Sequence, residues 1–141
     1  MTQEQIANAL LNIPLTNQIR HAALHPYRFV YIDGCNTGAG NFCEAFGIPA
    51  MTVSTNFFAA IGAESRAFVG FKSWTLDFNI WTWTPYSYMT GDFLKDWLNG
   101  VPVQTCVNNA KSDTHGNGVN MNSSAVVYGA ADLQHDTLTG Q

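Results

Sequence analysis

The chain has 141 residues, of which 46% are hydrophobic and only 11% are charged, and its formal net charge is -4. This length fits one domain with a sizeable core, and Asn, Thr, Ser and Gln must supply much of its polar surface. Its six Lys and Arg residues are scattered singly, which argues against nucleic-acid binding and against a polybasic membrane anchor.

The cysteines and histidines further restrict the class of protein. Cys35, Cys43 and Cys106 form no Cys-x-x-Cys pair and are too few for a disulfide framework, which favours a reducing, cytoplasmic compartment. The four histidines show no metal-ligand spacing, so we expect no metal and no cofactor. The N-terminus lacks the features of a signal peptide, and no run reaches the roughly 18 apolar residues of a membrane span. We therefore expect a soluble protein.

The first elements in chain order are a helix and a strand. Apolar residues recur at helical spacing over residues 3–13, so residues 1–25 are predicted to form a helix and a linker. Residues 28–32 then form a strand, whose four large apolar residues show no alternation, as in parallel sheets buried on both faces. Reacting groups gather just past the carboxyl ends of such strands, where Asp33 and Cys35 fall.

Helices and strands alternate along the rest of the chain. The predicted helices cover residues 41–46, 56–61, 92–98 and 102–110, and the predicted strands cover residues 66–71 and 125–128. A glycine inside the first of these strands, Gly70, lets another backbone approach closely. Residues 112–124 are predicted to form a surface loop and residues 134–141 a polar tail. The order helix then strand is typical of βαβ units.

Aromatic residues are concentrated in one segment. Eight of them lie between Trp74 and Trp97. This concentration suits core packing, and it equally suits an apolar wall beside a substrate cleft, because loops after strand ends line such clefts.

Four stretches follow one another in a characteristic order. "FVYIDGCNTG" has an apolar run followed by Gly, Cys, a variable residue, Thr and Gly. "ESRAFVGFKSWTLD" has Ala-x-x-Gly before a tryptophan and an acid, "FLKDWLNGVPVQTCVNNA" has two helices with a Gly break, and "VVYGAADL" is a closing strand. Together they cover roughly residues 26–133 and resemble the caspase-like cysteine peptidases of the clostripain, gingipain and separase type, with their CHAT-domain relatives.

The resemblance implies a fold and a site. The fold would be α/β, a three-layer caspase-like core around a parallel sheet, with residues 1–141 as a single partial domain lacking the N-terminal strands. Cys35 would be the nucleophile, and its own backbone N–H would help to form an oxyanion hole. Asp77, with Trp74 beside it, would face a basic side chain of a peptide substrate.

The resemblance also implies that part of the site is missing. In the family, a His-Gly pair ends the strand that precedes the cysteine strand. His21 and His25 lie in no such pair, and His115-Gly116 lies in the loop before the last strand. We therefore expect the C-terminal part of a peptidase that is inactive alone, whose bare strand edge at residues 28–32 binds either a second copy or a complementary N-terminal half.

Two alternatives remain open. The chain is alternatively a non-catalytic relative, in which the caspase-like core serves self-assembly or partner binding. It is otherwise an α/β domain with an accidental likeness, in which case residues 29–32 and 67–71 would not pair in parallel.

Overall fold

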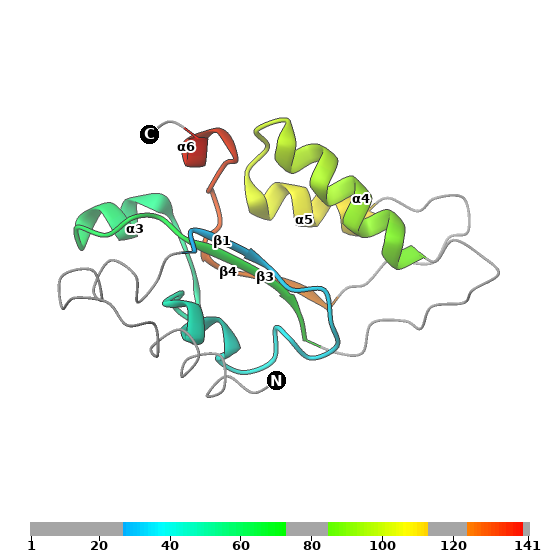
Figure 1. The fold of residues 1–141 in the computed structure, drawn as a ribbon, viewed down its shortest axis with the longest axis horizontal. Coiled ribbons are helices and arrows are strands. Elements are labelled where there is room, and N and C mark those ends of the chain that lie inside the picture. Colours follow the sequence, from blue (N-terminus) through cyan, green and yellow to red (C-terminus); the bar gives the residue numbers. More distant parts are fainter. Residues whose placement is uncertain (1–26, 73–84, 113–123, 140–141) are drawn as a thin grey trace, which may run out of the picture.

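The computed structural model describes residues 27–72, 85–112 and 124–139 (Figure 1). Their elements are β1 (Phe29–Tyr31), η1 (Phe42–Phe46), β2 (Thr52–Val53), α3 (Thr55–Ala60), β3 (Ala67–Phe71), α4 (Pro85–Leu98), α5 (Val103–Ser112), β4 (Ala125–Ala130) and α6 (Asp136–Thr139). The predicted N-terminal helix over residues 3–13 lies outside the described residues. In the part of the chain that is described, no helix is long and apolar enough to cross a membrane.

The four strands form one mixed sheet in the order β1-β3-β4-β2. β1 pairs with β3 in parallel, with Phe29 opposite Ala67, which confirms the parallel pairing expected for these two strands. β2 also pairs with β4 in parallel. However, β3 and β4 are antiparallel, with Phe71 opposite Ala125, so the sheet is mixed and the predicted parallel arrangement is wrong for this pair of strands.

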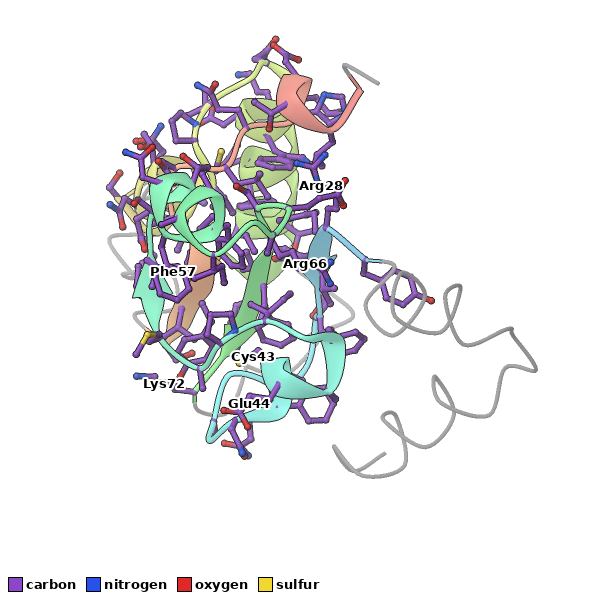
Figure 2. All side chains as sticks on the ribbon, turned by 90° about the vertical axis from the view of Figure 1, so that its left-hand side faces the viewer. Arg28, Cys43, Glu44, Phe57, Arg66 and Lys72 are labelled. Carbon is purple, nitrogen blue, oxygen red and sulfur yellow. The ribbon has the colours of Figure 1, made fainter. Side chains whose placement is uncertain are left out.

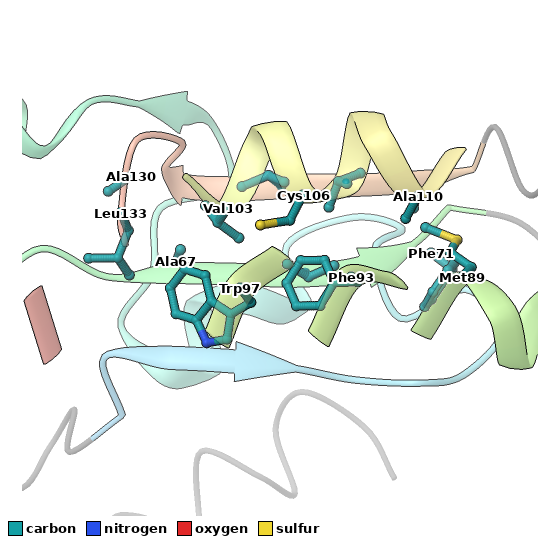
Figure 3. Close-up of a cluster of buried hydrophobic side chains, with 14 of the residues drawn as sticks. Ala67, Phe71, Met89, Phe93, Trp97, Val103, Cys106, Ala110, Ala130 and Leu133 are labelled. Atoms are coloured by element: carbon teal, nitrogen blue, oxygen red, sulfur yellow. The ribbon is translucent and has the colours of Figure 1, made fainter. Parts of the chain in front are cut away.

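The helical hairpin of α4 and α5 explains this antiparallel pairing. α4 begins near the carboxyl end of β1, where Tyr31 bonds Thr90, and ends near its amino end, where Phe29 stacks on Trp97. α5 then carries the chain back along the sheet (Figure 3). Two helices return the chain to the end where β3 finished, so the next strand must run in the opposite direction.

The sheet separates two apolar clusters. Because side chains alternate along a strand, Ala67, Val69 and Phe71 of β3 face α4 and α5, whereas Phe68 faces η1. All five residues of β3 are buried, as the unbroken apolar run predicts. α4 and α5 cover one face of the sheet and η1 lies on the other (Figure 1), which gives three layers.

Several helix boundaries differ in detail from the predicted ones. η1 is a 3-10 helix that ends at Gly47, whose φ of 69° is accessible to glycine. α4 begins at Pro85, seven residues before the predicted start at residue 92, because proline is favoured in a first helical turn. Within the predicted polar tail, α6 forms, and Leu138 packs against the larger cluster.

Candidate functional site

Cys35 lies just beyond the carboxyl end of β1. The backbone N–H of Ile32 still donates to Val69 O of β3 at 3.0 Å, and the chain leaves the sheet after that bond. Cys35 is exposed. The following residue, Asn36, has a φ of 60°, a left-handed conformation that asparagine tolerates better than most residues. The chain therefore turns sharply directly after the cysteine.

Thr37 fastens this turn to two strands. Its hydroxyl donates to two carbonyl oxygens, that of Gly34 at 2.8 Å and that of Ile32 at 3.1 Å. The same hydroxyl accepts the backbone N–H of Phe71 at 3.2 Å. One hydroxyl thus joins the end of β1 to the end of β3.

Gly38 continues the attachment to β3 and β4. Its N–H donates to Phe71 O at 2.9 Å, and its carbonyl accepts the Tyr128 hydroxyl at 2.9 Å. A Cβ on Gly38 would lie 2.9 Å from the backbone carbon of Gly70, a shorter distance than Cβ atoms keep from other atoms in real proteins. The two glycines permit this backbone contact, as predicted for Gly70. We call residues 33–38, held in this way by three strands, the cysteine loop.

Partial desolvation raises the pKa of two side chains at this end of the sheet, the exposed Asp33 and the partly buried Tyr31. Desolvation raises the pKa of the Asp33 carboxyl above its ordinary value. Desolvation also raises the pKa of Tyr31, the Asp33 charge adds to the rise, and the hydrogen bond to Thr90 opposes it. The strand end that carries the cysteine loop therefore disfavours negative charge at both side chains.

The other two cysteines are buried. Cys43 and Cys106 are both 0% exposed. Desolvation raises each pKa to about 11, with smaller contributions from the charges of Glu44 and Asp96 respectively. The Cys106 thiol also donates to Val101 O at 3.2 Å. Neither thiol forms a nucleophilic thiolate at neutral pH.

The predicted substrate residues Asp77 and Trp74 lie outside the described residues, as do His21, His25 and His115. Among the described residues, the single histidine is His135. Its ring meets the edge of Trp97 at 6.0 Å, near the amino end of β1, where Arg28 bonds Thr137 O. It thus lies at the opposite end of the sheet from the cysteine loop. The described part of the chain also has no group of three metal-binding side chains.

The position of the cysteine at a strand end is predictable from the sequence, but the attachments of its loop are not. Thr37 and Tyr128 anchor it through hydrogen bonds that join residues 34 and 90 positions apart in the chain. The one local signal was the pair of glycines, Gly38 after the strand and Gly70 within the next. Comparison with family models, with curated proteins and with solved structures finds no match for this chain.

Proposed function

We propose that this chain is the cysteine-bearing part of a caspase-like cysteine peptidase, with Cys35 as its nucleophile. The observation that carries the proposal is the position of an exposed cysteine beyond β1, parallel to β3, on a loop that three strands hold in place. Such support preorganises a reacting group, since few residues of the loop are left to reorganise during the reaction.

The chemistry is acyl transfer. The Cys35 thiolate attacks a peptide carbonyl, the C–N bond breaks, the amine leaves with a proton, and water hydrolyses the thioester to release the acid and restore the thiol. The backbone N–H of Cys35 supplies an oxyanion donor. The loops that follow two neighbouring parallel strands start at the same end of the sheet. This supports Asp77 and Trp74, which follow β3 in the sequence, as residues that contact a basic side chain of the substrate.

A complementary segment supplies the base. Arg28 O and Ile32 N bond to β3, and because bonding direction alternates along a strand, the N–H and C=O groups of Phe29 and Tyr31 face the other way. No described strand lies on that side of β1. We propose that an N-terminal half carrying a histidine adds a strand along this edge, through β-augmentation.

Alkylation rates test the nucleophile. The full chain is treated with iodoacetamide between pH 5 and pH 9, and labelling at each cysteine is followed by peptide mass spectrometry. Cys35 should be labelled first, because its thiol is exposed whereas those of Cys43 and Cys106 are buried. Cys43 and Cys106 serve as internal references, and in urea all three should react alike. Labelling of Cys35 that is no faster than labelling of the two buried thiols would contradict a reactive cysteine at this position.

Turnover tests the need for a second half. The chain alone should not cleave peptides with Arg or Lys before the scissile bond, because no described histidine lies at the cysteine end of the sheet. Turnover that Cys35→Ala abolishes would show that the chain is complete.

A non-catalytic assembly protein is the second candidate. It is favoured by large apolar side chains that are exposed on α3 and just after it, Phe57 and Ile61. Slow, uniform alkylation of the three cysteines would favour this candidate.

A further inference from the structure

An apolar hollow lies between η1, α3 and the start of β3, away from the cysteine loop. It has a volume of about 440 Å³. Its floor includes the buried Ile48 and Phe58, and its walls include Phe57 and Ile61. Two charged residues, Glu44 and Arg66, also line it. Figure 2 views the molecule from another side than Figure 1 and labels Phe57, Glu44 and Arg66. We call these six residues the α3 surface.

The exposure of the walls favours a protein as the occupant. Phe57 is 40% exposed and Ile61 is 61% exposed, so the walls project from the surface and would not enclose a small molecule, which deep pockets bury almost completely. Projecting apolar side chains around a hollow, with polar groups among them, are typical of protein–protein contacts.

The two charged residues of the α3 surface favour a second copy of this chain as the partner. The α3 surface has one carboxylate, Glu44, and one guanidinium, Arg66, so a two-fold axis that passes between them would bring each charge onto the opposite charge of a second copy. In such an isologous contact, residue i meets residue j and residue j meets residue i. Arg66 is partly buried. Desolvation lowers its pKa, the charge of Glu64 opposes this change, and the charge of Arg28 adds to it.

We propose that two copies of this chain pair through the α3 surface about a two-fold axis, with Arg66 of each copy facing Glu44 of the other. Phe57 and Ile61 of both copies then leave water together, which supplies most of the driving force. A net charge of only -4 per chain opposes this association weakly. The proposal does not depend on the reactivity of Cys35, and it uses a different surface from the edge of β1.

Sedimentation of the full chain tests the apolar part of this contact. Between 1 and 100 µM the wild type should pass from monomer to dimer. Ile61→Asp should weaken the dimer at least tenfold, because it places a carboxylate in the apolar centre. Leu98→Asp is the matched control, since Leu98 is 63% exposed on α4, and it should leave the dimer unchanged. A wild type that stays monomeric, or a dimer that Ile61→Asp leaves intact, overturns the proposal.

Charge exchange tests the two-fold geometry. Glu44→Arg and Arg66→Glu should each weaken the dimer at least threefold, because like charges then face each other across the axis. In an equimolar mixture of the two variants, every facing pair is again opposite, so a heterodimer should recover. Thermal melts establish that each variant is folded. If Arg66→Glu does not fold, Arg66→Gln replaces it, and its mixture with Glu44→Gln should recover part of the lost affinity, because that heterodimer keeps one Arg66–Glu44 pair and neither homodimer has one. Failure of the folded exchange pair to recover rules out the two-fold pairing.

Discussion

The close contact between Gly38 and Gly70 predicts how far the substitution Gly38→Ala should lower the free energy of unfolding. In Gly38→Ala, the added Cβ would lie 2.9 Å from two backbone atoms, the carbon of Gly70 and the nitrogen of Phe71, and 2.6 Å from a methyl group of Val126. Backbone atoms of a central strand do not give way cheaply, so the cysteine loop must lift. Such overpacking costs about 1–3 kcal/mol.

Lifting the loop also breaks hydrogen bonds. Those from Gly38 N to Phe71 O and from Tyr128 to Gly38 O are each worth about 1 kcal/mol. If the loop moves far enough to lose one of them, the free energy of unfolding should fall by roughly 2–4 kcal/mol in total. Urea denaturation followed by tryptophan fluorescence measures this loss, and alkylation of Cys35 should show a changed rate.

Gly91→Ala is the matched control. Gly91 lies inside α4, and a Cβ there would meet nothing within 4 Å, so alanine should stabilise the protein by about 0.5–1 kcal/mol through its better helix propensity. The same substitution, glycine to alanine, should thus lower the free energy of unfolding at position 38 and raise it at position 91. A Gly38→Ala variant within about 0.5 kcal/mol of the wild type, with an unchanged Cys35 rate, would refute the role assigned to the glycine contact.

Two further predictions concern β1 and Asp33. Because the amides of Phe29 and Tyr31 face away from β3, they should exchange their hydrogens at least tenfold faster than that of Ile32, which bonds Val69 O; equal protection, measured by NMR, would mean that another segment already covers this edge. Partial desolvation raises the folded-state pKa of Asp33, so the stability contributed by its protonated form is present at low pH and is lost as pH rises through that pKa. Asp33→Asn should therefore raise Tm at pH 7 and have less effect at pH 3, as followed by circular dichroism; a lower Tm at pH 7 would contradict this.

The parts of the fold that the sequence predicts are those with strong local signals. An unbroken apolar run predicts a strand that is covered on both faces, and it indicated β1 and β3 as parallel neighbours. β3 is fully buried, whereas the residues of β1 are only partly buried, because β1 lies at the edge of the described sheet. Gly100 and Pro102 marked the break between α4 and α5, because glycine accepts the left-handed φ of 76° after α4 and proline is favoured at the start of a helix. Cys35 at a strand end followed from these elements.

The remaining features depend on contacts between distant segments. The antiparallel direction of β4 follows from the path of the two helices before it. The sequence of β4 itself does not indicate this direction. β2 has only two residues, Thr52 and Val53, too few for a periodic pattern. The hydroxyls of Thr37 and Tyr128 acquire their roles only when the strands meet.

The separation of the two apolar clusters by the sheet has a consequence for oxidation. Cys43 belongs to the cluster beneath the sheet and Cys106 to the one above it, so the strands between them prevent a disulfide within the folded chain. Both thiols are also shielded from dissolved oxidants. A peroxide would therefore react first with Cys35, and because its two potential resolving thiols are buried, the resulting sulfenic acid would condense with a thiol from another molecule.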